Sequence, residues 1–212
     1  TRQQRLSANL WLFEGGDPNK ARQLTVGERN LDGWIGVAAA PDARIIFTAF
    51  DGKATDLFSM NADGSGRVQL TTSAHSSNTW PSMANGGRVA FTSNRSGGRQ
   101  VWVMEADGTN QRQLTFGEQP RESAYAPAIA PDGSEVFFIK LGVGRAAVWK
   151  ASVDGGEATQ VSRLTAASVE AFLSISPDGK WIAYRHVSSA KQSADEEGAT
   201  TIGVISSDGA RE

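Results

Sequence analysis

The chain has 212 residues, of which 39% are hydrophobic, which is enough for one sizeable core or one compact repeat array. Its 21 Lys and Arg residues nearly balance its 23 Asp and Glu residues, and no basic block interleaves with aromatic residues, so the pattern of a nucleic-acid binder is missing. The absence of Cys excludes disulfides, thiol catalysis and thiolate metal sites. No apolar run is long enough for a transmembrane helix, so insertion into a membrane is not expected.

A repeated unit runs through the chain from its first residues onward. Residues 10–13 form a short apolar segment, and the first unit ends at Leu24-Thr25. The pair recurs at Leu70-Thr71, Leu114-Thr115 and Leu164-Thr165, with separations of 70−24 = 46, 114−70 = 44 and 164−114 = 50 residues. Between the pairs, short runs of strand-forming residues alternate with turns rich in Gly, Asp and Asn, so each repeat is predicted to form four short antiparallel strands.

Turns of the type small-Pro-Asp occur once in most repeats. They stand at Ala40-Pro41-Asp42, Ala130-Pro131-Asp132-Gly133 and Ser176-Pro177-Asp178-Gly179, with Ala84-Asn85-Gly86-Gly87 as a degenerate fourth. The side chains of Asp132 and Asp178 are expected to accept hydrogen bonds from amides of their own turns, which is a structural role. A repeat of about 45 residues made of short strands and tight turns is typical of propeller blades.

The sequence therefore predicts an all-β fold, a β-propeller of four-stranded antiparallel blades. The predicted units are a half blade at residues 9–25, blades at 33–71, 79–115 and 125–165, and an incomplete blade at 170–209. Because the chain starts and stops within a blade, we expect a partial ring of about four to five blades from a larger ring. The third strands carry Trp11, Trp102 and Trp149, which we expect to be buried between blades.

The tract SPDGKWIAY at residues 176–184 closely resembles the repeat of the TolB-type, WD-like β-propeller family. The tracts VWVMEADGTNQRQL at 101–114 and LFSMNADGSGRVQL at 57–70 resemble the strand-turn-strand end of the same repeat. The resemblance extends over residues 9–209, with Asn85-Gly86 in place of Pro-Asp in one repeat. Repetition makes the resemblance specific for the fold, whereas the function must be argued from the site.

The resemblance implies a non-catalytic scaffold for protein or ligand binding or sensing within a larger bacterial protein. Relatives include periplasmic members of the Tol system and sensor domains fused to kinases or winged-helix regulators. The alternative is the substrate-gating propeller of a prolyl-oligopeptidase-type serine peptidase whose catalytic domain is absent here. The resemblance favours a periplasmic or other extracytoplasmic location, although the residues themselves leave the compartment open.

No set of residues for catalysis, metal binding or a cofactor stands out. His75 lies in a polar connector, and His186 lies where a strand is predicted to end. The patterns Gly-x-Ser-x-Gly, His-Glu-x-x-His and Gly-x-x-x-x-Gly-Lys are absent. The sequence therefore predicts neither an enzyme nor a metal or cofactor site.

Recognition is expected at one rim of the propeller, where the loops between second and third strands lie beside the connectors between blades. This rim collects the longer, more varied and more polar segments, and aromatic residues begin several inner strands there. We therefore expect a protein partner or small ligand to bind at this rim, because scaffolds carry recognition on variable loops held by rigid strands. The candidate residues are Trp34, His75, Trp80, Arg95, Arg121 and Glu122. In the alternative interpretation these loops are merely solvated and the aromatic residues plug the central channel.

Overall fold

The structure is a computed structural model that describes residues 6–27, 31–39, 43–73, 75–117, 122–142, 145–162, 168–188 and 200–211. In this part of the chain the ordered elements are strands, apart from two single 3-10 turns, η1 (Glu14–Gly16) and η2 (Pro18–Lys20). Every strand pairing within the sheets is antiparallel. The protein is therefore all-β in the residues described.

The strands form five sheets that follow one another along the chain. A two-stranded sheet comes first, followed by three four-stranded sheets and a three-stranded sheet. In that order their strands are β1 (Trp11–Phe13) and β2 (Ala21–Gln23); β3 (Val37–Ala39), β4 (Arg44–Phe50), β5 (Thr55–Asn61) and β6 (Val68–Gln69); β7 (Asn78–Met83), β8 (Arg88–Ser93), β9 (Gln100–Glu105) and β10 (Arg112–Gln113); β11 (Ser123–Ile129), β12 (Glu135–Gly142), β13 (Arg145–Ser152) and β14 (Thr159–Gln160); β15 (Ser168–Ile175), β16 (Trp181–Ser188) and β17 (Thr200–Ser206).

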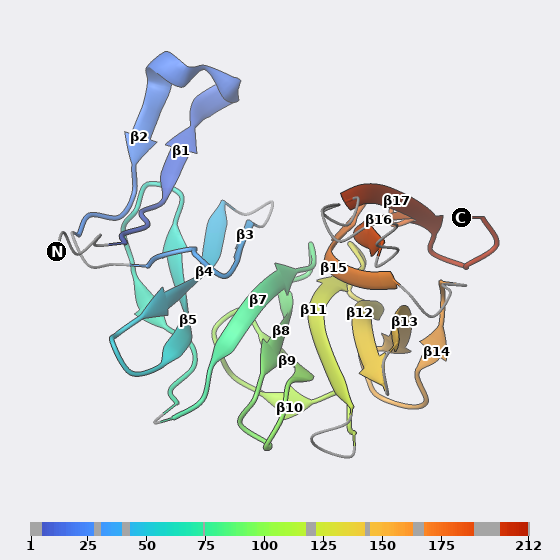
Figure 1. Ribbon diagram of the computed structural model, residues 1–212. Coiled ribbons are helices and arrows are strands. Elements are labelled where there is room, and N and C mark those ends of the chain that lie inside the picture. Colours follow the sequence, from blue (N-terminus) through green and yellow to red (C-terminus); the bar gives the residue numbers. More distant parts are fainter. Residues whose placement is uncertain are drawn as a thin grey trace, which may run out of the picture.

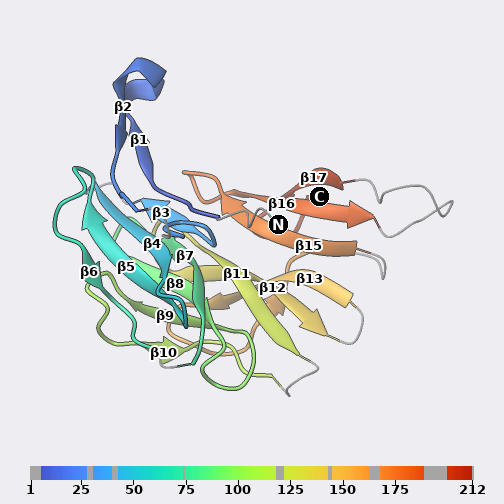
Figure 2. The same ribbon diagram turned by 60° about the vertical axis from the view of Figure 1, so that its left-hand side comes forward.

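The sheets stand side by side in an arc, with the first strands β3, β7, β11 and β15 toward its inner side (Figure 1). The β1–β2 hairpin projects from one end of the arc, as a second view also shows (Figure 2). Within the described residues β1 and β2 do not pair with β15–β17, so strand pairing does not close the arc. This arrangement confirms the predicted propeller of four-stranded antiparallel blades in a partial ring.

The hydrophobic core lies between neighbouring blades rather than inside any one of them. One cluster joins Leu57 and Leu70 of the β3–β6 blade to Phe91 and Met104 of the next blade. The following boundary is filled in the same way, by Val101 and Leu114 against Val136 and Phe138. Successive side chains of a strand point to opposite faces, so the central strands of a blade bury both faces against its two neighbours.

The Leu-Thr pairs end each blade because the Thr hydroxyl closes the sheet. The Thr71 hydroxyl accepts a hydrogen bond from the Leu57 amide at 2.9 Å, and the Thr115 hydroxyl accepts one from the Val101 amide at 2.9 Å. In the next blade the Ser162 hydroxyl accepts the equivalent bond from the Val148 amide at 3.0 Å. A hydroxyl in place of a further backbone carbonyl satisfies the third strand where the short fourth strand ends.

The fourth closing pair is therefore Val161-Ser162, which corrects the assignment to Leu164-Thr165. Those two residues lie outside the described part of the chain. In all four repeats a Gln precedes the pair and donates to the carbonyl oxygen of the closing residue, at 2.7 to 2.9 Å. Val161 and Ser162 supply the same apolar side chain and hydroxyl as Leu and Thr, but they are different residue types. The literal pattern Leu-Thr therefore matches the wrong pair in this repeat.

The Asp residues of the tight turns are structural, as expected. The Asp132 carboxylate accepts hydrogen bonds from the amide and hydroxyl of Ser134, and that of Asp178 accepts bonds from the Lys180 amide and the Ser176 hydroxyl. These bonds lower the pKa of both carboxyl groups. The corresponding turn at Ala40-Pro41-Asp42 lies outside the described residues.

The expectation that the third-strand tryptophans are buried is wrong for Trp11. Its side chain is 52% exposed, because within the described residues its sheet consists of the two strands of the projecting hairpin. Trp102 and Trp149 are half-buried and pack against the clusters on either side of the β7–β10 blade. The burial of such a residue thus depends on a neighbouring blade and not on the strand alone.

Candidate binding rim and inter-blade cleft

A first hollow lies where the connector before β3 meets the end of β4. It has a volume of about 230 Å³ and is mainly apolar, with Trp34, Phe50, Leu31 and Ile35 among its lining residues. The side chains of Trp34 and Phe50 are 58% and 40% exposed. Two large aromatic side chains are thus presented to solvent beside a concave surface.

The connector that carries Trp34 is fixed by an ion pair whose carboxylate is buried. The Asp32 carboxylate, almost entirely buried, accepts two hydrogen bonds from the Arg67 guanidinium at 3.0 and 3.3 Å. The next amide, that of Gly33, donates to the Thr48 carbonyl oxygen at 2.7 Å. Because the preceding backbone is fixed at two points, the exposed position of Trp34 is set by the fold.

A second hollow, of about 170 Å³, lies where β7 begins. It shares Ile35 with the first hollow and is also lined by Trp80 and Arg99. The Arg99 guanidinium lies 5.7 Å from the centre of the Trp80 ring, and the Tyr125 ring lies 5.9 Å from it on the next blade. The two hollows therefore adjoin along the rim and combine three aromatic walls with a cation.

Trp80 owes its orientation to a bulge in the inner strand. Its φ is +49°, a rare value for a bulky residue, and the register of β7 against β8 shifts at this point. Ala126 and Phe172 have positive φ at the same place in β11 and β15, where the register shifts as well. Gly36 takes this place before β3, and the separations are 80−36 = 44, 126−80 = 46 and 172−126 = 46 residues.

The bulges could have been inferred from one signal that the sequence analysis did not use. Pro81 and Pro127 follow the bulge residues directly, and a proline is tolerated at a bulge because no ladder hydrogen bond is needed there. At Gly36 the reason for glycine is also steric, since a Cβ atom would lie 2.7 Å from Cδ of Pro81. The Trp80 amide donates to the Ile35 carbonyl oxygen at 2.9 Å, so neighbouring inner strands are in direct contact here.

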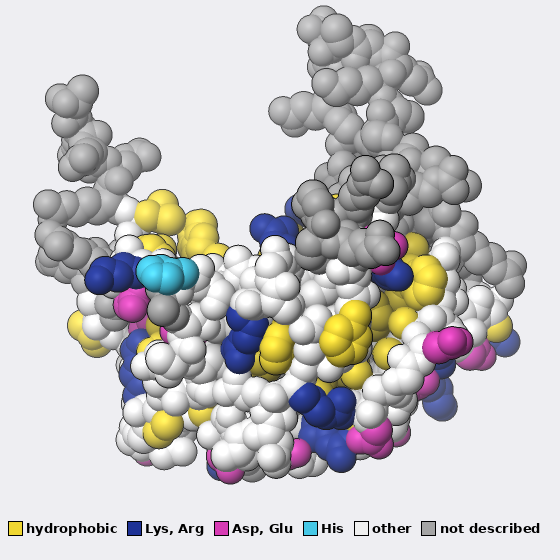
Figure 3. Space-filling view, turned by 90° about the horizontal axis from the view of Figure 1, so that it is seen from below, with side chains coloured by type: hydrophobic (Ala, Val, Ile, Leu, Met, Phe, Trp, Pro, Cys, Tyr) yellow, Lys and Arg dark blue, Asp and Glu magenta, His cyan; other side chains and the backbone are white. Residues whose placement is uncertain are grey.

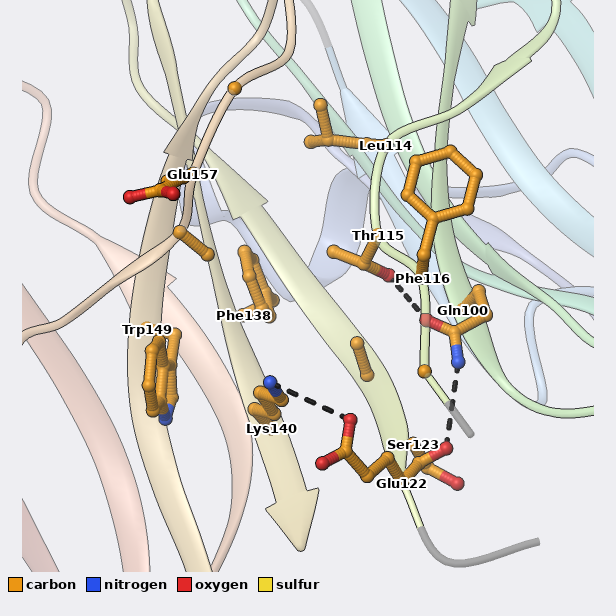
Figure 4. A pocket seen from close by; sticks show the side chains of 14 residues that line it. Gln100, Leu114, Thr115, Phe116, Glu122, Ser123, Phe138, Lys140, Trp149 and Glu157 are labelled. Carbon is orange, nitrogen blue, oxygen red and sulfur yellow. Dashed lines mark hydrogen bonds and ion pairs between the residues drawn. The ribbon is translucent and has the colours of Figure 1, made fainter. Parts of the chain in front are cut away.

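A third and larger opening is a cleft of about 290 Å³ between the β7–β10 and β11–β14 blades (Figure 4). Phe138 and Trp149 form one wall and Phe116 stands on the other side, with its side chain 74% exposed. At one end the Lys140 ammonium lies 3.7 Å from the Glu122 carboxylate and 5.0 Å from the centre of the Trp149 ring. We call this opening the inter-blade cleft.

Three of the six candidate residues line these openings. Trp34 lines the first hollow, Trp80 the second and Glu122 the inter-blade cleft. The His75 side chain is exposed. On the face of the molecule that Figure 3 shows, hydrophobic side chains lie among charged groups. Arg121 lies outside the described residues. Sequence reasoning missed Phe50, Arg99, Phe116 and Trp149, because only the tertiary structure brings them beside these residues.

Arg95 makes several hydrogen bonds within its own blade. Its guanidinium donates to Asn78 at 2.8 Å, to Gln111 at 2.7 Å and to the Ser93 hydroxyl at 3.0 Å. It also lies over the Trp102 ring, 4.8 Å from its centre. Burial lowers the pKa of this guanidinium, and the charge of nearby Asp56 opposes that shift.

Two other kinds of feature are absent from the described residues. No group of three or more His, Cys, Asp or Glu side chains in this part of the chain is placed to hold a metal ion. No helix in the same residues is both long and apolar enough to span a membrane.

Four-stranded blades in an arc, with hollows at a loop-bearing rim, define this protein as a β-propeller domain. Its sequence matches the family model described as "TolB beta propeller domain" over residues 26–211. The chain belongs to this family.

Known proteins show how far the similarity extends. The "Protein TolB homolog" of Chlorobium chlorochromatii is 43% identical over 78 residues, which are 37% of this chain and only 17% of that protein. The structure of putative TolB from Agrobacterium tumefaciens matches 95% of this chain and 71% of that chain, with a TM-score of 0.76 and 19% identity. A puromycin-hydrolyzing peptidase of Mycobacterium tuberculosis matches 92% of this chain and 30% of that chain, with a TM-score of 0.66 and 12% identity. At these identities the two structures show a shared fold alone.

Proposed function

We propose that this domain is a non-catalytic binding module whose rim binds an extended segment of a protein partner. One observation carries the proposal: the two adjoining hollows at the rim present Trp34, Phe50 and Trp80 on rigid blades. Large aromatic side chains beside a concave surface dominate the binding energy of many protein interfaces. This module would serve as a scaffold or sensor within a larger bacterial protein, an interpretation supported by the likeness to TolB homologues.

The chemistry of the hollows indicates what the segment would contain. The first hollow is mainly apolar, so it suits an aliphatic or aromatic side chain. The second adds the Arg99 guanidinium, the Asn94 side chain and the Thr79 hydroxyl, which suit carbonyl or carboxylate oxygens. A segment that lies across Ile35 would place an apolar side chain in one hollow and a polar group in the other.

A random-peptide display library selected on the purified domain tests this proposal. We expect enriched sequences with apolar residues, and we expect Trp34→Ala and Phe50→Ala to weaken binding of the selected peptides at least tenfold. Trp181→Ala is the matched control, since Trp181 is also an exposed tryptophan but borders the Ser176–Gly179 turn on the opposite rim. Peptides whose binding survives both rim substitutions, or a selection that yields none, would overturn the proposal.

The non-catalytic part of the proposal has its own test. The purified domain is expected not to hydrolyse generic ester or peptide substrates above the uncatalysed rate. Hydrolysis that copurifies with the domain and is lost in a rim variant would show that the module is an enzyme.

A second candidate is the gating propeller of a serine peptidase, favoured by the likeness to the puromycin-hydrolyzing peptidase. In that case the coding sequence beyond Glu212 should contain Gly-x-Ser-x-Gly followed by Asp and His. Kinase or winged-helix signatures before Thr1 would instead favour the sensor role. The sequence of the gene that encodes this domain distinguishes the two.

A further inference from the structure

Three boundaries between consecutive blades contain an equivalent pair of aromatic side chains. The two rings come from directly paired residues of the second and third strands: Phe47 with Phe58, Phe91 with Trp102, and Phe138 with Trp149. Each pair packs with the Leu that closes the preceding blade, which is Leu24, Leu70 or Leu114. The three boundaries can therefore be compared position by position.

At the first two boundaries a guanidinium of the same blade covers the aromatic pair. The Arg67 guanidinium lies 4.8 Å from the Phe58 ring and 5.1 Å from the Phe47 ring, and it is held by Asp32. The Arg95 guanidinium lies 4.8 Å from the Trp102 ring and 5.5 Å from the Phe91 ring. In both cases a planar cation lies on the rings while oxygen acceptors bind its N–H groups.

At the third boundary the side chains that fill these positions are short. The residue directly before the fourth strand is Arg67 in the first of these blades, Gln111 in the second and Ala158 in the third. The third blade therefore has an alanine where the other two have a long polar side chain. Asn78, which holds Arg95, is two residues before its bulge residue, and Ala124 is the residue at that place in the next blade. Both alanines line the inter-blade cleft, which the missing side chains leave open.

The remaining volume is too large to be a packing defect. The cleft of about 290 Å³ is roughly ten times the ~30 Å³ that one water occupies in the liquid. The Lys140 ammonium lies over the Trp149 ring and 3.7 Å from the Glu122 carboxylate, so it occupies the end of the cleft near Glu122 (Figure 4). Glu157 lines the other end, so the charged side chains of the lining are two carboxylates and one ammonium, and the lining is net negative.

We infer that the inter-blade cleft receives the arginine side chain of a protein partner. Its guanidinium would stack on Phe138, next to the Trp149 ring over which the Lys140 ammonium already lies, and would donate to Glu157. Arginine fits better than lysine because its planar head covers a ring and donates in a fork, whereas Lys140 already supplies a point charge. This site is separate from the rim hollows and does not depend on the proposed function there.

One variant tests the internal comparison on which the inference rests. Ala158→Arg supplies a guanidinium from the position that Arg67 occupies in its own blade. We expect it to fill the cleft and to raise the thermal unfolding midpoint by about 2–4 °C. Ala158→Gln, which copies Gln111, is the control and should change the midpoint by less. A lower midpoint for Ala158→Arg than for Ala158→Gln would show that the boundaries are not equivalent.

The ligand is tested by titrating the wild-type domain with Nα-acetyl-arginine amide and observing the indole N–H signal of Trp149, assigned with Trp149→Phe. We expect a saturable shift, and at least tenfold weaker binding of the neutral citrulline analogue of the same shape. Glu157→Gln should weaken binding several-fold, Ala158→Arg should abolish it, and Trp34→Ala should leave it unchanged. Equal binding of the citrulline or lysine analogue, or binding that persists in Ala158→Arg, would overturn the inference. Because Trp34→Ala disables only the rim, failure of one proposal is distinguishable from failure of the other.

Discussion

Gly108 lies against the carbonyl oxygen of Leu70, so close that a Cβ atom on residue 108 would approach that oxygen to 2.8 Å. Gly108 belongs to the Asp-Gly turn of one blade, and Leu70 belongs to the closing pair of the blade before it. The contact recurs at Gly64 with Leu24 and at Gly209 with Val161, where the corresponding distances are 3.2 and 2.7 Å. The Asp-Gly turn and the closing pair, the two most regular motifs of the sequence, thus contact each other across the boundary between blades.

Gly108→Ala is expected to destabilise the domain more than Gly87→Ala. Their φ values are +86° and +87°, so both variants incur the cost of a left-handed L-residue, about 1–2 kcal/mol. At residue 87 the new Cβ would only meet the Ala106 Cβ at 3.7 Å, an ordinary contact. At residue 108 the new Cβ must displace backbone atoms, which we expect to increase the loss of unfolding free energy by about 1–3 kcal/mol. Equilibrium unfolding in urea measures the difference between the two variants. Equal losses in the two variants would show that the contact with Leu70 is unimportant.

Thr115→Val should remove the hydroxyl that closes the β7–β10 blade. The Val101 amide and the side-chain oxygen Oε1 of Gln100 would lose their partners in a buried place, which we expect to cost about 1–3 kcal/mol of unfolding free energy. The exposed neighbour at Thr72 provides a control, since Thr72→Val should stay within about 0.5 kcal/mol. Chemical denaturation of both variants measures the difference, and an unchanged Thr115→Val protein would contradict the proposed closure.

Arg95→Ala should act on stability and not on recognition at the rim. Loss of its bonds to Asn78 and Gln111 leaves the Asn78 side chain, which is buried, without this donor, and we expect a loss of about 2 kcal/mol. Arg99→Ala, at an exposed arginine, should cost about 1 kcal/mol or less. Thermal unfolding distinguishes the two. If Arg95→Ala retains full stability and loses binding of rim-selected peptides, Arg95 is a contact residue after all.

Acid should destabilise the domain through the Asp residues of its turns. Hydrogen bonds from the hydroxyl and amide of Thr109 hold the pKa of Asp107 below its ordinary value of 3.8. Because the folded-state pKa is the lower of the two, the unfolded chain binds the proton first as the pH falls. The contribution of the Asp107 carboxylate to stability is fully present above the unfolded-state pKa and is lost as the pH falls through the folded-state pKa. The shift has the same direction at Asp63, Asp132, Asp178 and Asp208.

The free energy of unfolding should therefore decline below about pH 4. Thr109→Ala removes the largest cause of the Asp107 shift and should make the decline shallower. Unfolding curves collected between pH 2 and pH 6 measure both. A Thr109→Ala protein with the same dependence on pH as the wild type would argue against this source of stability.

The sequence alone determined the propeller fold, because the repeated residues are those that make the same contacts in every blade. Turn residues such as Asp132 and the closing hydroxyls of Thr71 and Thr115 act within one blade, so their chemistry is local and recurs at regular spacing. Trp34 and Trp80 could also be placed at the rim, since the order of strands and loops decides on which rim a connector lies.

The tertiary structure alone decided where the blades differ. From the sequence Arg95 is a loop residue with no evident partner. In the structure it donates hydrogen bonds to Asn78 and Gln111, which are 17 and 16 residues away in sequence. Trp11 has the same place in the repeat as Trp102, but in the described residues no further strand pairs with its hairpin, and its side chain stays exposed. The inter-blade cleft arises because Ala124 and Ala158, which are distant in sequence, both line the boundary between the same two blades, so its size depends on side chains far apart along the chain.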